Sequence, residues 1–451
     1  MKIAMIGLGT IGETILKNLS DENHTVTVID EDKALVERLI EKYDVLGIVG
    51  NGACLDIQKE AGMKDFDLAI ALTNSDELNV FACLVAKKIG VKNTIARVRN
   101  PDYRKQIIEM RDFLGISMIV NPEQEMAREI FNIINLPSVA QIEHFAKGRV
   151  SLVEVIVEPK STLIGETLIS LGQKLKTKVL ICAIQRGEEV IIPSGRTEIK
   201  EGDRIHFTAN SNSLGDFLSE TGLVKSRIKN IMITGGGRTA YYLSDALSKK
   251  KYKIKLVEED YKRAELLSEL LPHVTVIHSS PAQHDVLIEE GIENMDALIA
   301  LTDVDEENMI VSMFASKKNV KKIITQIKSD DLYGLLGELS LNTTVSPKHI
   351  VAGRVISYIR ALDNSVGSNV LNMYQLVNGS LEALEFAAKR EENFYNKPLR
   401  ELKLKEGCLI ACITRQSEII IPDGNSEIKL GDNVIVVTTH KNFDDLSLIF
   451  N

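Results

Sequence analysis

Three glycines near the start of the chain have the spacing that binds the pyrophosphate of a dinucleotide. Gly7, Gly9 and Gly12 form G-x-G-x-x-G in the stretch MIGLGTIGETI, directly after the apolar segment KIAMI. In this motif the first glycine permits a tight turn, the second leaves room for the phosphates, and the third lets a helix pack closely. A helix starting near Thr10 would direct its free N–H groups and positive dipole at the phosphates.

An acidic residue follows at the distance expected for a ribose ligand. Asp30 lies 18 residues after Gly12, at the end of the next apolar segment, TVTVI. A carboxylate there accepts hydrogen bonds from both ribose hydroxyls and repels a 2′-phosphate. The pattern therefore favours NAD(H) or an adenine nucleotide over NADP. The structural alternative is a tight turn followed by a solvated aspartate.

These features occur twice, because the chain is a tandem duplication. IMITGGGRTA repeats IAMIGLGTIG, and Gly235 follows Gly7 by 228 residues. Thr302 follows Thr73 by 229 residues, and IIPDGNSEIKLGD repeats IIPSGRTEIKEGD at that same offset. An offset that stays almost constant over the full length indicates two copies of a two-module unit.

The second copy keeps the binding loop with substitutions. Ala240 takes the place of the third glycine, which the motif tolerates, and Glu258 takes the place of Asp30. Arg238 stands where the first copy has Thr10, beside the expected phosphate path. Arg238 either neutralises an additional phosphate or is simply exposed on the first turn of a helix.

Apolar segments that alternate with helical segments predict the elements that position these residues. In the first module we expect strands at KIAMI, TVTVI, VLGIV, DLAIAL, TIARV and SMIV, and helices at LVERLIEKY, NVFACLVAKKIG and residues 123–134. Such alternation predicts a parallel sheet covered by helices on both faces. The shorter strands LVEVIV, VLICAIQ, EVIIP and DRIHFTA, separated by turns such as PSG and EGD, predict a small α+β domain.

The fold class predicted is therefore α/β, with two tandem Rossmann-like domains, each followed by a small α+β domain. The expected domains are residues 1–138, 139–225, 226–365 and 366–451, with linkers at NLPS and VKSRIKN.

Polar residues at the ends of the central strands should line the ligand crevice. In open parallel sheets, ligands bind where the strand order reverses, above the carboxyl ends of the first and fourth strands. Thr73 and Asn74 end the expected fourth strand. Arg97 ends the fifth strand, where it either reaches a phosphate or ribose or forms an ion pair with Asp76 or Glu77. The crevice positions of the second copy are Thr302 and Asp303.

Composition restricts the class of protein. The net charge is −9, and basic residues form no stripe, so nucleic acid is a poor candidate partner. The 5 cysteines are odd in number and form no C-x-x-C pair, which fits apolar filling in a reduced cytosol. No apolar run approaches the ~18 residues that span a bilayer. We expect a cytosolic protein without a secretory leader, whose membrane role requires a partner.

The sequence lacks groups that would use a bound nucleotide as a reactant. A hydride-transfer enzyme usually needs a positioned acid or base. No tyrosine is followed by lysine four residues later, and the 8 histidines do not recur at matching positions in the two copies. H-E-x-x-H, C-x-x-C and G-K-[ST] motifs are missing. We therefore predict a sensor without catalytic or metal-binding residues. The alternatives are an NAD-dependent oxidoreductase and a scaffold with vestigial loops.

The ordered motifs resemble those of a known family. MIGLGTIG, VTVIDED, ALTNSDELN, ARVRNPDY and NPEQEMA, followed by STLIGETL and IIPSGRTEIKEGDRI, resemble the TrkA family of Trk-system potassium uptake proteins along essentially the whole chain. The resemblance implies two RCK modules, each a Rossmann-type domain followed by a TrkA-C domain. It also implies a homo-oligomeric cytosolic ring, expected to be a tetramer, beneath a membrane potassium-translocating subunit. Members bind NAD(H) and ATP or ADP and are not known as catalysts.

The resemblance implies two sets of nucleotide-binding residues. One departure from the family is that GNGA at 50–53 and SSPA at 279–282 lack the acidic residue of the usual G-D-A-[ST] turn. The implied first site comprises Gly7, Leu8, Gly9, Thr10, Ile11, Gly12, Asp30, Thr73, Asn74 and Arg97. The implied second site comprises Gly235, Gly236, Gly237, Arg238, Thr239, Glu258, Thr302 and Asp303.

Overall fold

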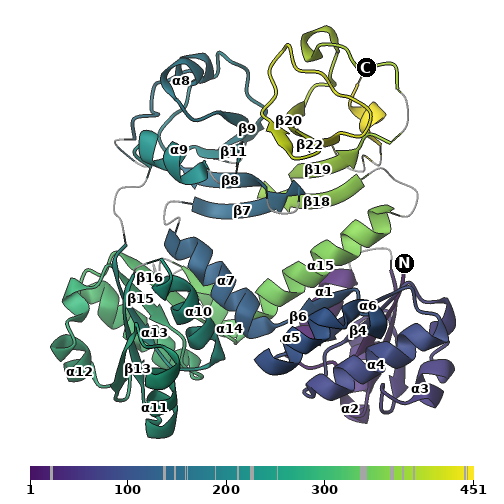
Figure 1. The fold of residues 1–451 in the computed structure, drawn as a ribbon, viewed down its shortest axis with the longest axis vertical. Helices are drawn as coiled ribbons and strands as arrows, with labels where there is room; N and C mark the ends of the chain where they lie inside the picture. The colour runs from purple at the N-terminus through teal and green to yellow at the C-terminus, as the bar shows by residue number, and fades with distance from the viewer. Residues whose placement is uncertain are drawn as a thin grey trace. The chain divides into compact units, whose positions relative to one another are not determined.

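Two parallel and two antiparallel β-sheets organise the chain (Figure 1). The computed structural model describes residues 1–20, 24–135, 139–146, 149–157, 159, 161–187, 189–210, 213–223, 228–250, 252–335, 343–365, 370–377, 380–389, 392–440, 443 and 445–450. The predicted fold class is confirmed. The predicted domain boundaries at 138–139, 225–226 and 365–366 involve residues outside these ranges, as do parts of both predicted linkers.

The first parallel sheet has the strand order of a dinucleotide-binding domain. Its order is β3-β2-β1-β4-β5-β6, so the direction of strand addition reverses between β1 and β4. Its strands are β1 (Lys2–Ile6), β2 (Thr25–Asp30), β3 (Leu46–Val49), β4 (Leu68–Ala71), β5 (Asn93–Arg97) and β6 (Met118–Val120). Its helices are α1 (Thr10–Leu19), α2 (Lys33–Lys42), α3 (Leu55–Glu60), α4 (Asp76–Ile89), α5 (Pro101–Glu109), α6 (Arg111–Leu114) and α7 (Pro122–Asn135).

The ends of α4 illustrate how the sequence sets these elements. Ser75 caps the helix by accepting a hydrogen bond from the Leu78 N–H at 3.2 Å. Acidic residues lie in the first turn and lysines in the last, which complements the helix dipole. Gly90, with φ +127°, ends the helix in a conformation that other residues rarely adopt. These signals fix where α4 starts, immediately after the crevice residues.

The second parallel sheet repeats the first. Its order is β14-β13-β12-β15-β16-β17. Its strands are β12 (Asn230–Thr234), β13 (Lys253–Glu258), β14 (Thr275–His278), β15 (Ala297–Ala300), β16 (Lys322–Gln326) and β17 (Thr344–Val345). Its helices are α10 (Arg238–Ser248), α11 (Tyr261–Leu270), α12 (His284–Glu289), α13 (Asp305–Lys317), α14 (Asp330–Leu335) and α15 (Pro347–Ser365).

The two antiparallel sheets form the small domains. The first, in the order β10-β9-β11-β8-β7, comprises β7 (Val139–Phe145), β8 (Val150–Ile156), β9 (Val179–Arg186), β10 (Glu189–Ile191) and β11 (Arg204–Asn210), with α8 (Leu168–Lys174) and α9 (Leu214–Glu220). The second, in the order β18-β19-β22-β20-β21, comprises β18 (Val370–Leu376), β19 (Leu381–Ala387), β20 (Cys408–Arg415), β21 (Glu418–Ile420) and β22 (Asn433–Thr438). The pattern analysis missed β7, the first strand of its sheet.

The chain divides into two compact units that each combine parts of both copies. One unit contains Met1–Asn135 and Ile228–Ile356, and the other contains Leu136–Arg227 and Ser357–Asn451. In the first unit α7 buries Met126, Ile130 and Ile134 in the core of the second parallel sheet. Burying each such side chain contributes roughly 1.5–3 kcal/mol, so α7 joins the two Rossmann-like domains firmly.

The repeated turn motif of the small domains has a structural role. Asp203, in the EGD turn, is buried and accepts two hydrogen bonds from the Arg186 guanidinium at 2.8 and 2.7 Å. Asp432, in the repeated LGD turn, accepts the same pair from Arg415 at 2.8 Å each. A bidentate guanidinium–carboxylate pair fixes the turn that precedes a central strand. Within the described residues, no helix has the length and apolar content needed to cross a bilayer.

Candidate functional site

The glycine loop of the first copy forms a tight turn at the carboxyl end of β1. Gly7 has φ +84°, and a Cβ there would lie 2.6 Å from the Thr73 backbone nitrogen. A Cβ on Gly12 would lie 2.8 Å from the Gly7 carbonyl oxygen, which explains the third glycine. Gly9, by contrast, is the N-cap of α1 and would have no neighbour within 4 Å of a Cβ. The loop therefore leaves open space at the N-terminus of α1, where the phosphates were predicted.

Asp30 holds this loop in place from the end of β2. Its carboxylate accepts hydrogen bonds from the Leu8 N–H at 2.8 Å and from the Asp32 N–H at 3.0 Å. A carboxylate has about four acceptor positions, so two remain for ribose hydroxyls. Asp30 thus links the loop that would bind phosphate to the position that would bind ribose.

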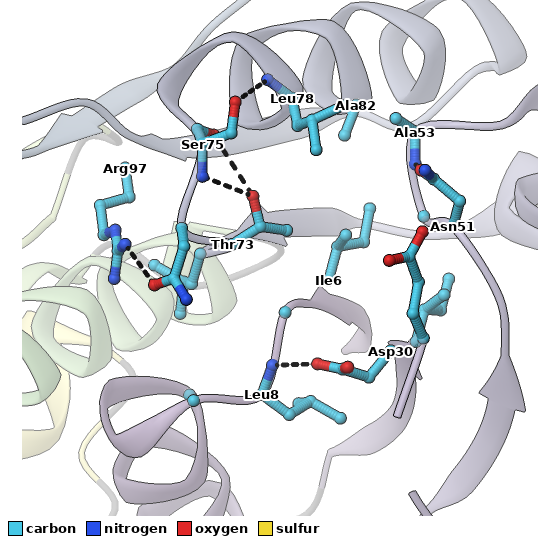
Figure 2. A pocket seen from close by; sticks show the side chains of 18 of the residues that line it. Ile6, Leu8, Asp30, Asn51, Ala53, Thr73, Ser75, Leu78, Ala82 and Arg97 are labelled. Atoms are coloured by element: carbon cyan, nitrogen blue, oxygen red, sulfur yellow. Dashed lines mark hydrogen bonds between the residues drawn. The ribbon is translucent and has the colours of Figure 1, made fainter. Parts of the chain in front are cut away.

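A cavity of about 520 Å³ joins these elements. This volume lies in the usual range for small-molecule and cofactor sites. In Figure 2 Asp30 lies beside Leu8 and Asn51, whereas Arg97 lies on the other side of the cavity near Thr73. The lining comprises Ile6, Gly7, Leu8, Gly9, Thr10, Ile11, Gly12, Ile29, Asp30, Glu31, Gly50, Asn51, Gly52, Ala53, Leu72, Thr73, Asn74, Ser75, Leu78, Ala82 and Arg97. The structure thus brings together every residue predicted for the first site.

A buried asparagine that the sequence analysis did not assign to the site connects the ends of β4 and β5. Asn79 is fully buried and accepts hydrogen bonds from the Thr73 N–H and hydroxyl, both at 2.7 Å. It donates to the Thr73 and Arg97 carbonyl oxygens at 3.1 and 3.0 Å. Asn308 makes the equivalent backbone contacts in the second copy. Recurrence of this asparagine in both copies was the available signal.

Arg97 is buried in the cavity wall and pairs with neither predicted acid. Its side chain is 8% exposed, its Nη2 donates to Asn74 Oδ1 at 3.1 Å, and its buried Nε has no hydrogen-bond partner. Asp76 instead accepts from the Arg99 and Asn100 N–H groups at 2.9 and 2.7 Å. Burial and then the neighbouring charge of Arg99 lower the pKa of the Arg97 guanidinium, although arginine remains protonated.

The second copy reproduces the loop with a compensating pair of substitutions. Glu258 accepts hydrogen bonds from the Gly236 N–H and, at 2.8 Å, from the Asp260 N–H, as Asp30 does in the first copy. A Cβ on Gly236 would lie 2.6 Å from the Glu258 carboxylate, so the longer acid requires glycine where the first copy has Leu8. Loop and acid have therefore changed together.

The second loop has an additional contact that the sequence analysis missed. Arg263, on the first turn of α11, donates from Nε to the Gly236 carbonyl oxygen at 2.7 Å. Leu35 occupies the corresponding position in the first copy. Gly237 is the N-cap of α10 and would have no neighbour within 4 Å of a Cβ, like Gly9. The phosphate position is thus open in both loops, but the second loop is held from two sides.

The crevice beside the second loop carries different charges. Gln326 stands at the position of Arg97 and donates to the Thr302 carbonyl oxygen at 3.2 Å. Asp303 pairs with Lys328 at 2.6 Å, with both side chains well exposed. Arg238 is the exposed first residue of α10, and Thr239 follows it. The structure therefore places the predicted residues of the second site around their own loop, with less buried positive charge.

Comparison with known proteins agrees with this architecture. The TrkA-N domain model matches residues 3–122 and 231–347, and the TrkA-C domain model matches residues 152–222 and 384–451. The chain is 30% identical to the Trk system potassium uptake protein TrkA of Vibrio alginolyticus, over 100% of this chain and 98% of that protein. It is 31% identical to Trk system potassium uptake protein TrkA homolog 1 of Methanosarcina mazei, over 97% of each.

A solved structure has a similar fold at low sequence identity. The GsuK channel bound to NAD matches with a TM-score of 0.63 and 17% identity, over 98% of this chain and 77% of that one. Both domain models match twice, and the full-length relatives match end to end. The chain belongs to the TrkA family of Trk-system potassium uptake proteins, with two tandem pairs of TrkA-N and TrkA-C domains.

Proposed function

We propose that this protein is a nucleotide-sensing regulatory subunit of a Trk-type potassium uptake system, which controls flux through a separate membrane subunit. The observation that carries the proposal is the cavity of about 520 Å³ in which the glycine loop, Asp30 and Arg97 meet. NAD(H), ATP and ADP are the proposed ligands. The relatives are named as potassium uptake proteins, and the solved channel of similar fold is bound to NAD.

The composition of the cavity wall favours binding without chemistry. The lining contains no histidine, lysine, tyrosine or cysteine, which are common general acids, bases and nucleophiles. The Asp30 carboxylate already accepts two backbone hydrogen bonds that position the loop. The proposed role is therefore that of a sensor, in preference to an NAD-dependent oxidoreductase.

The proposed signal is a shift between ring states that bind nucleotide differently. A ligand shifts such an equilibrium only by the difference between its affinities for the two states. Leu78 lines the cavity and is also exposed on α4, next to Phe81 and Leu84. We call these three side chains the α4 patch. On α13, Ile310 and Met313 occupy the positions of Phe81 and Leu84 and are also exposed.

These patches support the proposed homo-oligomeric ring. Apolar patches at matching positions of both copies are typical of protein–protein contacts, and symmetric oligomers are the usual assembly of such chains. Because Leu78 belongs to both the cavity and the α4 patch, ligand binding would act directly on a subunit contact. We place the ring at the cytosolic face of the membrane, attached through the potassium-translocating subunit.

Binding without turnover is the first test of this proposal. Calorimetric titration of the purified protein with NADH, NAD, ATP and ADP should detect binding of at least one of them. NADH absorbance should stay constant when candidate carbonyl substrates are added, because the cavity wall supplies no proton donor. Protein-dependent NADH oxidation that disappears in a Gly9→Asp variant would favour the oxidoreductase. Lack of binding by all four nucleotides would favour the scaffold with vestigial loops.

A further inference from the structure

The two copies differ most in charge at one place, the carboxyl end of the fifth strand of each parallel sheet. Arg97 ends β5, and Gln326 ends β16 at the corresponding position. Both side chains are buried and lie beside the residue that ends the neighbouring strand. The first crevice therefore contains a buried positive charge that the second crevice lacks.

The positive charge of Arg97 is not balanced by a partner in the described part of the chain. Its one printed contact is with the neutral amide of Asn74, and its Nε is buried without a hydrogen bond. The nearby acid Glu123 is already paired with Arg99, whose Nε lies 2.6 Å from Glu123 Oε1. A buried charge without a counter-ion is costly, and supplying an anion removes that cost. The site is thus suited to a ligand that brings negative charge to Arg97.

The position of Arg97 determines which part of a nucleotide it would meet. Asp30 defines the ribose end of the cavity, the N-terminus of α1 defines the position of the first phosphates, and Arg97 lies beyond both (Figure 2). In NAD(H) the group beyond the pyrophosphate is an uncharged ribose with its nicotinamide. In ATP it is the terminal phosphate, and in ADP the second phosphate already approaches this end. A guanidinium there discriminates strongly between these ligands.

We propose that the first site prefers a nucleoside polyphosphate, whose terminal phosphate binds Arg97, and that the second site prefers a dinucleotide. This inference rests on the proposed function and adds a ligand class to each site. At the second site, Gln326 offers an amide to an uncharged ribose or nicotinamide, and the charges of Asp303 and Lys328 neutralise one another.

Arg238 does not reverse this assignment. The sequence pattern allowed it to neutralise an additional phosphate at the second site. In the structure Arg238 is exposed on the first turn of α10, where water screens its charge. Arg97 is 8% exposed, and its charge acts through a less polar surrounding. The buried charge therefore decides the preference between phosphate-rich and phosphate-poor ligands.

The test measures each site separately in the full-length chain. Gly237→Asp closes the second loop and reports on the first site, and Gly9→Asp does the reverse. Titration calorimetry with ATP, ADP and NADH should show tighter binding of ATP than of NADH at the first site and the opposite order at the second. Arg97→Gln should weaken ATP binding at the first site by about tenfold or more, but NADH binding by less than about threefold.

Two further variants complete the test. Gln326→Arg should strengthen ATP binding at the second site, and this gain remains informative even if Arg97→Gln fails to fold. Arg97→Lys should retain most of the preference for ATP, because it keeps the charge. Equal losses of ATP and NADH binding in Arg97→Gln, or no change in either, would overturn the inference while leaving the proposed function intact. Failure of the unmodified protein to bind any of the three nucleotides would refute both.

Discussion

The Gly9→Asp variant is expected to lose nucleotide binding at the first site while the protein remains as stable as the wild type. Gly9 caps α1 with φ −58° and ψ −173°, a conformation open to any residue, and a Cβ there meets no atom within 4 Å. Aspartate is a favourable N-cap, so the helix should not be weakened. Its carboxylate would occupy and repel the phosphate position, which should reduce affinity by about 100-fold or more.

Calorimetry in the Gly237→Asp background, together with thermal unfolding, measures both parts of this prediction. Gly7→Ala is the matched control, because its Cβ would lie 2.6 Å from the Thr73 backbone nitrogen and its φ is +84°. That variant should lower the unfolding temperature, whereas Gly9→Asp should not. Unchanged nucleotide affinity in Gly9→Asp would show that the phosphates bind elsewhere.

Combined Phe81→Asp and Ile310→Asp substitutions are expected to dissociate the oligomer. Phe81 and Ile310 are each 54% exposed and occupy corresponding positions of α4 and α13. If these faces are subunit contacts, a charged residue at each would have to lose its hydration on assembly, which is strongly unfavourable. Because both side chains are exposed in the single chain, the substitutions should leave its folding intact.

Light scattering at micromolar protein concentration, with and without nucleotide, measures this effect. Ile40→Asp is the control, since Ile40 is a similarly exposed apolar residue on α2, away from both patches. The control should keep the mass of the unmodified oligomer, whereas the double variant should shift towards the single chain. An unmodified protein that is strictly monomeric would contradict the ring itself, and an unchanged mass in the double variant would place the contacts on another surface.

Local patterns in the sequence predicted the parallel sheets well. Each expected strand of the first module corresponds to a strand of the structure, because buried parallel strands are continuous apolar runs such as KIAMI. The helix expected at 123–134 is α7, Pro122–Asn135. The strand β7 was missed because VAQIEHF mixes polar and apolar residues without a strong run. The duplication helped throughout, since each motif could be compared with its copy.

The partners of the site residues could not be predicted in this way. The interaction of Arg97 with Asn74, and not with Asp76 or Glu77, depends on which atoms lie nearest across two strands. The contact of Arg263 with the Gly236 carbonyl joins residues 27 positions apart through the packing of α11. Such contacts depend on tertiary geometry, which spacing along the chain does not determine. The charge difference between the two crevices became visible only when these contacts were compared.

Potassium flux through a reconstituted membrane subunit tests the central claim most directly. Vesicles that contain the potassium-translocating subunit would be measured with and without this protein, and with ATP, ADP or NADH. A typical coupling of about 1–3 kcal/mol predicts that at least one nucleotide changes the flux roughly 5–150-fold. The Gly9→Asp, Gly237→Asp double variant should abolish this response without preventing binding to the membrane subunit. Flux that ignores all three nucleotides while the two proteins demonstrably bind one another would contradict the account.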